Sequence, residues 1–248
     1  MRKKKHRILR ERAGTTLVET LVETLVSLLL MSILIGMAAR VLSGAYRVYL
    51  RLQKTQYAES ILDTAMTEVR DLANEACGYV KLYTDGVQIA DQVGNKTGTA
   101  MEFLDSNGYV VLISTDGCEE TTLYRGNDLE NVIGTQKALP KGRLLARYYN
   151  RKNDGTYLYT DGTKPVARAA AEAYGEGFYM GYYLKVTYRV PDETTNGGEL
   201  SSLVADVALY QDENCTELVI SDTEILDFRY KIKYSEGVTA TTVMNNTP

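Results

Sequence analysis

The first feature of the chain is a nearly unbroken apolar run. Residues 15–39, TTLVETLVETLVSLLLMSILIGMAA, contain only two charged residues, Glu19 and Glu23. As an α-helix this run spans about 37 Å, whereas its uncharged part, residues 25–39, spans only about 22 Å. The hydrocarbon core of a membrane is roughly 30 Å thick. The pattern therefore predicts a membrane-spanning helix that carries both carboxylates near its N-terminal end.

The next stretch has the periodicity of an amphipathic helix. Between residues 41 and 76, apolar positions recur in steps of mostly three and four, and no proline occurs before Pro140. Gly78 is a candidate C-terminal cap. We therefore expect one helix from about residue 16 to 77. Its polar face carries Gln53, Lys54, Glu59, Asp63, Glu68, Arg70 and Asp71.

Beyond residue 78 the pattern changes to short runs in which apolar and polar residues alternate, bounded by Gly, Asn or Asp, which is typical of β-strands. Asn107–Gly108 and Asp154–Gly155 are the best hairpin turns. The alanine-rich stretch 167–174 is a candidate short helix. The chain has 19 Tyr and 3 Phe, most of them in this domain, which we interpret as sheet packing in preference to a carbohydrate-binding or adhesive face. The pattern predicts an α+β fold whose β domain is mainly antiparallel.

The distribution of charge indicates how the helix is oriented across the membrane. Residues 1–14 hold seven Lys or Arg and one Glu, so the net charge of −4 divides into a basic head and a body of about −10. Four further basic residues follow the apolar run, at positions 40, 47, 51 and 54. The more basic side stays in the cytoplasm, so we expect the N-terminus inside and the body outside. The acidic body does not indicate nucleic-acid binding.

The residue inventory leaves little room for catalysis. The only histidine is His6, in the basic head, which excludes histidine-based triads and histidine zinc sites in the body. Cys77, Cys118 and Cys215 lack metal-ligand spacing; one disulfide with a spare thiol and three buried thiols are both compatible, and we favour free, buried thiols. No Ser-Lys or paired-carboxylate pattern is readable. We expect no enzyme activity, no metal and no cofactor.

Two ordinary interpretations fit the basic head and apolar run. A secretory signal peptide would be cut after Ser43-Gly44-Ala45, so that the mature chain begins at Tyr46 and both glutamates are discarded. An uncleaved signal anchor would keep them.

The junction between head and run is more specific. A basic leader ending in Gly14, followed by TTLVET at residues 15–20 and a long apolar tract, resembles the class III signal of type IV prepilins and pseudopilins. In that family a membrane peptidase cuts after the glycine, the new N-terminus is methylated, and a glutamate is the fifth mature residue. The resemblance implies cleavage between Gly14 and Thr15, N-methylation of Thr15, and an assembly role for Glu19. The family usually has Phe or Met where this chain has Thr15.

The LVET unit occurs twice, so two glutamates compete for the assembly role. Only Glu19 is fifth after a glycine; placing Glu23 fifth would put the cleavage after Val18, which is neither small nor flexible. Four inserted residues turn a helix by about 400°, so both carboxylates share one face. In pilin-like filaments the fifth-position glutamate is thought to pair with the N-terminal amine of a neighbouring subunit. The resemblance therefore favours Glu19 for assembly, with Glu23 as its second copy.

The resemblance implies three segments: a leader (1–14), a long helix whose first half spans the membrane (15–77), and an extracytoplasmic β-rich domain (78–248). It implies a filament subunit, a minor pilin or pseudopilin, stored in the cytoplasmic membrane. The implied partners are other pilin-like subunits, the prepilin peptidase, the pilus assembly machinery and membrane lipid. Two rivals remain: a membrane-anchored or secreted β domain that binds a ligand without forming filaments, and an extracytoplasmic hydrolase with an unrecognised site.

Overall fold

The structure is a computed structural model that describes residues 2–86, 92–118, 121–124, 132–136, 138–161 and 164–236. Of residues 2–16, 121–124, 132–136, 161 and 164 it describes the backbone alone. The chain forms two compact units, Met1–Gln56 and Tyr57–Pro248. The first is entirely helical where it is described, and the second contains the sheet.

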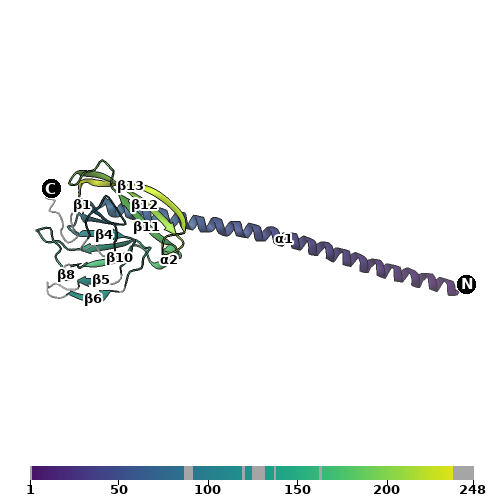
Figure 1. The fold of residues 1–248 in the computed structure, drawn as a ribbon. Coiled ribbons are helices and arrows are strands. Elements are labelled where there is room, and N and C mark those ends of the chain that lie inside the picture. Colours follow the sequence, from purple (N-terminus) through teal and green to yellow (C-terminus); the bar gives the residue numbers. More distant parts are fainter. Residues whose placement is uncertain are drawn as a thin grey trace. The chain divides into compact units, whose positions relative to one another are not determined.

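The long helix α1 runs from Arg2 to Asn74 (Figure 1). It confirms the predicted long helix but begins earlier, because the basic head is itself rich in Arg and Lys, which are good helix formers. It ends at Asn74, so the predicted end at Cys77 and the predicted cap at Gly78 are wrong. Strand β1 (Ala76–Tyr83) begins two residues later. A Cβ at Gly78 would lie 2.8 Å from Cδ2 of Leu104, so the glycine permits close packing within the strand.

The main sheet of the second unit has nine strands among the described residues, in the order β10-β7-β4-β3-β1-β13-β12-β11-β2. Every neighbouring pair is antiparallel except β1 and β13, which are parallel through Tyr79↔Lys233 and Val80↔Tyr234. The mainly antiparallel sheet is thus confirmed. Its remaining strands are β2 (Thr97–Gly98), β3 (Ala100–Asp105), β4 (Val110–Ser114), β7 (Leu145–Tyr149), β10 (Ala169–Glu172), β11 (Tyr183–Arg189), β12 (Glu199–Tyr210) and β13 (Leu218–Tyr234).

Smaller elements complete this unit. Strand β5 (Thr121–Tyr124) pairs with β6 (Val132–Gln136), β8 (Thr160–Asp161) pairs with β9 (Lys164–Pro165), and α2 is a single turn (Glu176–Tyr179).

Both hairpin turns predicted from the sequence are present. Gly108 and Gly155 have φ values of 86° and 85°, in the region that favours glycine. The Asp105 carboxylate accepts the backbone N–H groups of Asn107 and Tyr109 at 2.9 and 2.7 Å and so closes the first turn. The alanine-rich stretch is not a helix, however, because Ala169–Glu172 pairs with β7 as the edge strand β10.

The alternation of side chains along the strands separates two cores. On one face, α1 packs Ala58, Leu62, Ala65 and Val69 onto the sheet. On the other face, Tyr79, Tyr83, Leu104, Leu112, Tyr149 and Tyr157 form a second, tyrosine-rich core. Strand β1 contributes to both cores, since successive residues point to opposite faces. Half of this sheet is therefore enclosed on both sides.

Candidate functional site

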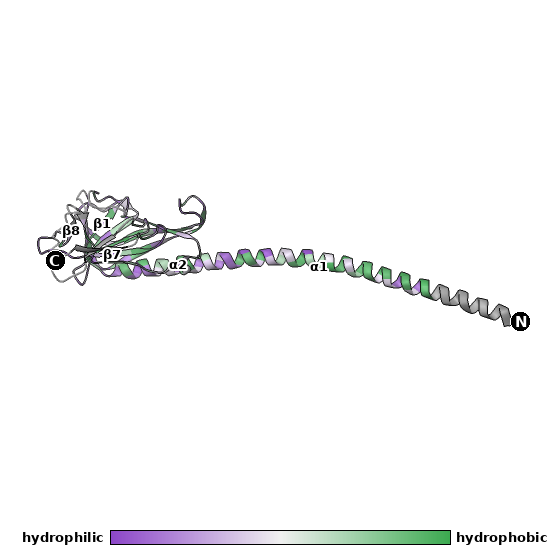
Figure 2. Ribbon diagram, turned by 90° about the horizontal axis from the view of Figure 1, so that it is seen from below, coloured by the Kyte–Doolittle hydropathy of each residue, from purple (hydrophilic) through white to green (hydrophobic). Residues whose placement is uncertain are grey.

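The first unit presents an apolar surface that no other described part of the chain covers. All residues from Leu17 to Leu52 are exposed, and Leu28 and Val41 each expose more than 70% of their area. Figure 2 shows this part of α1 as a mostly apolar ribbon. The segment that begins at Leu17 is long and apolar enough to cross a membrane. Exposed apolar surface on this scale marks a contact with lipid or protein.

Several hydroxyl groups within this segment donate hydrogen bonds to the backbone of the helix itself. The Thr24 hydroxyl donates to the carbonyl oxygens of Thr20 and Leu21 at 3.0 and 2.9 Å, and the Ser32 hydroxyl donates to that of Leu29 at 2.8 Å. These bonds lower the cost of placing hydroxyls in lipid, where no water is available.

The predicted assembly residues are exposed on this surface. Glu19 and Glu23 lie one helical turn apart, and neither makes a hydrogen bond or ion pair within the described part of the chain. A carboxylate in an apolar environment requires a partner of opposite charge or protonation. Any such partner for these two residues has to come from outside the described chain.

Gly14 and Thr15 lie within the backbone of α1, which continues through the predicted cleavage junction. Their side-chain surroundings lie outside what the structure describes. Cleavage and methylation at this junction stay predictions.

The second unit contains a buried polar cluster that the sequence reasoning missed. Glu102, on β3, is fully buried and accepts three tyrosine hydroxyl groups. Oε1 accepts Tyr79 at 2.8 Å, and Oε2 accepts Tyr83 at 3.0 Å and Tyr157 at 2.7 Å. Lys81, also fully buried, is the direct cross-strand neighbour of Glu102. We call these five residues the tyrosine–glutamate cluster.

Burial sets the protonation of this cluster. Desolvation raises the pKa of Tyr79, Tyr83 and Tyr157, and the Glu102 charge raises each further. Desolvation lowers the pKa of the Lys81 ammonium, while Glu102 opposes that shift. The tyrosines therefore stay protonated and donate to the carboxylate. Hydrogen bonds to charged groups contribute about 1.5–3 kcal/mol each. The cluster therefore stabilises the packing of β1, β3 and the segment around Tyr157 against one another.

Above about pH 10.5, we expect the second unit to lose stability steeply. Unfolded tyrosines release their protons above pH 10, whereas the folded Tyr79, Tyr83 and Tyr157 keep theirs, so their stabilisation is complete below pH 10 and lost as the pH rises. Each group contributes about 1.4 kcal/mol per pH unit, about 4 kcal/mol for the three. Lys81 acts with the opposite sign, below pH 10.5.

Urea unfolding of the full chain in detergent, repeated between about pH 10.5 and 11.5, measures this slope. Tyr83→Phe should make the slope shallower by one proton, and Tyr46→Phe, at an exposed position of the first unit, is the control. An identical slope in Tyr83→Phe and the parent chain would contradict the assignment.

A polar pocket of about 410 Å³ lies in the second unit. One of its carboxylates is engaged in loop structure, because Oδ2 of Asp116 accepts the Gly86 N–H at 2.7 Å and the Thr99 hydroxyl at 2.5 Å. No group of three or more His, Cys, Asp or Glu residues suited to a metal occurs among the described residues. The lining residues are Thr84, Asp85, Thr99, Thr115, Asp116, Lys141, Leu184, Lys185, Asn214 and Cys215.

None of the three cysteines forms a disulfide, as favoured from the sequence. Only Cys118 is buried, however, and Cys77 and Cys215 are half-buried, so the expectation of burial is wrong for these two. Burial raises the pKa of the Cys215 thiol in the pocket, and the nearby Lys141 and Lys185 only partly oppose this shift. A raised pKa keeps the thiol protonated and weakens it as a nucleophile.

No family model, no curated protein and no solved structure matches this chain.

Proposed function

We propose that the chain is a structural subunit of a type IV pilus-like or pseudopilus-like filament, in the role of a minor pilin or pseudopilin. The observation that carries the proposal is the uncovered apolar surface of residues 17–52. It follows a basic head ending in Gly14 and contains Glu19, which is fifth after that glycine. A β-rich second unit completes the layout that the family resemblance implies.

The length of the apolar surface favours a filament over a simple anchor. Residues 17–39 alone span about 35 Å as a helix, enough for the hydrocarbon core. Exposed apolar residues nevertheless continue for about 18 Å of helix, over residues 41–52. Water would surround this second part in an isolated anchor, whereas packing among neighbouring helices would bury it. Those exposed residues are Val41, Leu42, Tyr46, Val48, Tyr49, Leu50 and Leu52.

The proposed life cycle follows from this layout. The subunit waits in the cytoplasmic membrane with its N-terminus inside, is cut after Gly14 by a prepilin peptidase, and becomes methylated at Thr15. The assembly machinery then packs its helix among those of other pilin-like subunits. Glu19 neutralises the N-terminal amine of a neighbour, which accounts for a carboxylate in an apolar helix. On this proposal the protein acts as a structural subunit, with no catalytic role and no cofactor.

The polar pocket supports one alternative, a membrane-anchored β domain that binds a small ligand without forming filaments. The pocket combines two carboxylates, Asp85 and Asp116, with two ammonium groups, Lys141 and Lys185. On this alternative the exposed residues 41–52 have no role, so we favour the filament.

Gly14→Val should block removal of the leader. A β-branched side chain does not fit a peptidase site that requires a small, flexible residue, whereas Gly14→Ala should retain at least part of the cleavage. Immunoblots of cells that express the chain with a prepilin peptidase, using the C-terminal domain for detection, would separate the precursor from the product 14 residues shorter. Equal processing of Gly14→Val and the parent chain would contradict the proposed junction.

A further inference from the structure

The first unit carries an unpaired basic face on α1. Between residues 40 and 56 there are four basic residues and no acidic one. At 100° per residue, the four positions fall within about 60° of one another around the helix. All four are exposed and make no ion pair within the described part of the chain. This basic face consists of Arg40, Arg47, Arg51 and Lys54.

The part of α1 in the second unit carries the opposite charge. Three exposed carboxylates of the helix lie within about 120° of one another, on the side away from the buried Ala58, Leu62, Ala65 and Val69, and a fourth, Glu75, directly follows the helix. None of the four makes an ion pair within the described residues. This acidic face consists of Glu59, Asp63, Asp71 and Glu75.

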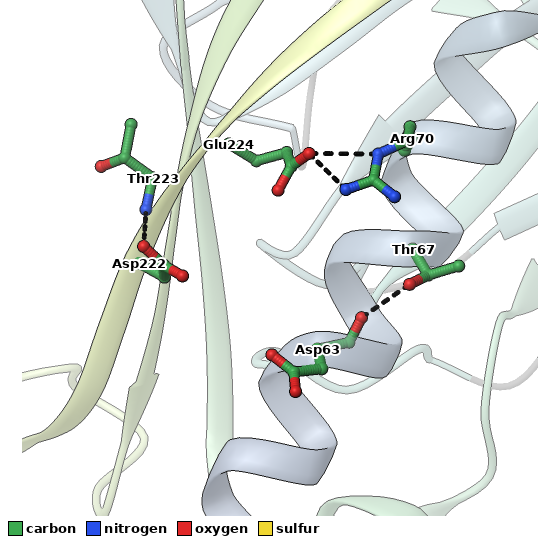
Figure 3. Close-up of polar contacts among 6 residues, drawn as sticks. All are labelled: Asp63, Thr67, Arg70, Asp222, Thr223 and Glu224. Carbon is green, nitrogen blue, oxygen red and sulfur yellow. Dashed lines mark hydrogen bonds and ion pairs between the residues drawn. The ribbon is translucent and has the colours of Figure 1, made fainter.

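The other charged groups of that helix segment are already engaged. Arg70 forms an ion pair with Glu224 on β13, and the Glu68 carboxylate accepts the Tyr174 hydroxyl at 3.1 Å. Figure 3 shows Arg70 reaching Glu224, whereas no dashed line joins the Asp63 carboxylate to the other residues drawn. The only bond drawn at Asp63 is to its backbone carbonyl, which accepts the Thr67 hydroxyl at 2.9 Å.

We propose that the basic face of one copy docks on the acidic face of a second copy. The proposal rests on the filament function above and names the contact between subunits outside the membrane. The basic face offers four positive groups and the acidic face four negative ones, and all but Glu75 belong to α1. Such a contact is directional: each copy offers one face to the subunit on one side and the other face to the subunit on the opposite side. It therefore propagates instead of closing into a dimer.

Anionic lipid is the competing partner for the basic face, and the length of the face argues against it. Headgroups add only about 5–8 Å to each side of the hydrocarbon core. Arg40 follows the apolar run directly, but Arg47 lies about 10 Å and Lys54 about 21 Å further along the helix. Only Arg40 is thus placed for a headgroup layer crossed by an upright helix, and the other three residues lie beyond it, where they are available to a protein partner.

Charge reversal of the two faces tests the contact in the full chain. Arg47→Glu/Arg51→Glu/Lys54→Glu should reduce the yield of sheared filaments about tenfold or more, because opposed like charges repel. Glu59→Lys/Asp63→Lys/Asp71→Lys should do the same. The six changes combined in one chain exchange the two faces and should restore assembly. Lys152→Glu/Arg229→Glu/Lys233→Glu, the same charge change at exposed positions elsewhere, is the control.

A photo-crosslinking residue at position 51 identifies the partner directly. The expected adduct joins it to a peptide from residues 57–75 of a second copy. Adducts with lipid alone, an undiminished yield in the first triple variant, or failure of the combined variant to recover would each overturn the proposed contact. If any of these results were obtained but the wild-type protein still formed filaments from chains that begin at Thr15, the filament function would remain supported and only the contact would be wrong. Wild-type protein that forms no filament would instead overturn both.

Discussion

Glu19→Ala is expected to abolish incorporation of the chain into filaments while leaving membrane insertion and leader removal intact. Removing a charge from an apolar helix favours insertion, because a carboxylate near mid-membrane costs up to about 3 kcal/mol. What is lost is the partner of the N-terminal amine of the neighbouring subunit. That amine is then left unpaired in an apolar environment, which costs several kcal/mol per contact.

Glu23→Ala is the matched control, since both glutamates are exposed on the same helix one turn apart. We expect it to change filament yield by no more than about twofold, because Glu23 is not in register with Gly14. Quantifying sheared filaments against membrane-bound subunit for both variants measures the difference. The register argument would be wrong if Glu23→Ala abolished assembly and Glu19→Ala did not.

Glu102→Ala is expected to cause the largest loss of stability in the second unit, about 3–5 kcal/mol. The substitution strips three buried hydroxyl groups of their acceptor and leaves the Lys81 ammonium without its cross-strand carboxylate. Asp206→Ala is the control, because its ion pair with Arg189 is well exposed and such pairs contribute at most about 1 kcal/mol.

Urea unfolding of the full chain in detergent, followed by near-ultraviolet circular dichroism of the tyrosines, measures both losses. Glu102→Leu combined with Lys81→Met removes the unpaired ammonium and fills the space of both side chains, so it should recover only part of the stability. The three tyrosine hydroxyl groups still lack their acceptor in this double variant. A loss of less than about 1 kcal/mol in the free energy of unfolding of Glu102→Ala would show that the cluster does not stabilise the second unit.

The helix and most of the strands could be predicted because their signals are local. A continuous apolar run, a helical period and alternating strands bounded by Asn107–Gly108 are visible in the sequence. The end of α1 could not be predicted, because Ala76 pairs with Asp105 on β3, and this contact depends on a residue far away in the sequence. The same holds for Ala169–Glu172, whose helical propensity is overridden by pairing with β7.

The candidate sites divide in the same way. The apolar surface and Glu19 follow from order along one helix, so they could be predicted from the sequence, which also showed the four basic residues at positions 40, 47, 51 and 54 without grouping them as a face. The tyrosine–glutamate cluster left one local signal, the alternation of Tyr79, Lys81 and Tyr83 on one side of a predicted strand. Its centre, Glu102, could not be found, because the pairing of β1 with β3 fixes which residue lies opposite Lys81.

The measurement that tests the filament proposal most directly is the N-terminal sequence and intact mass of the protein isolated from its own cells. The proposal predicts a chain that begins at Thr15, with or without one added methyl group. A chain that begins at Met1 or Arg2, as an uncleaved anchor would, contradicts it. So does a chain that begins at Tyr46, as conventional signal cleavage after Ser43-Gly44-Ala45 would leave.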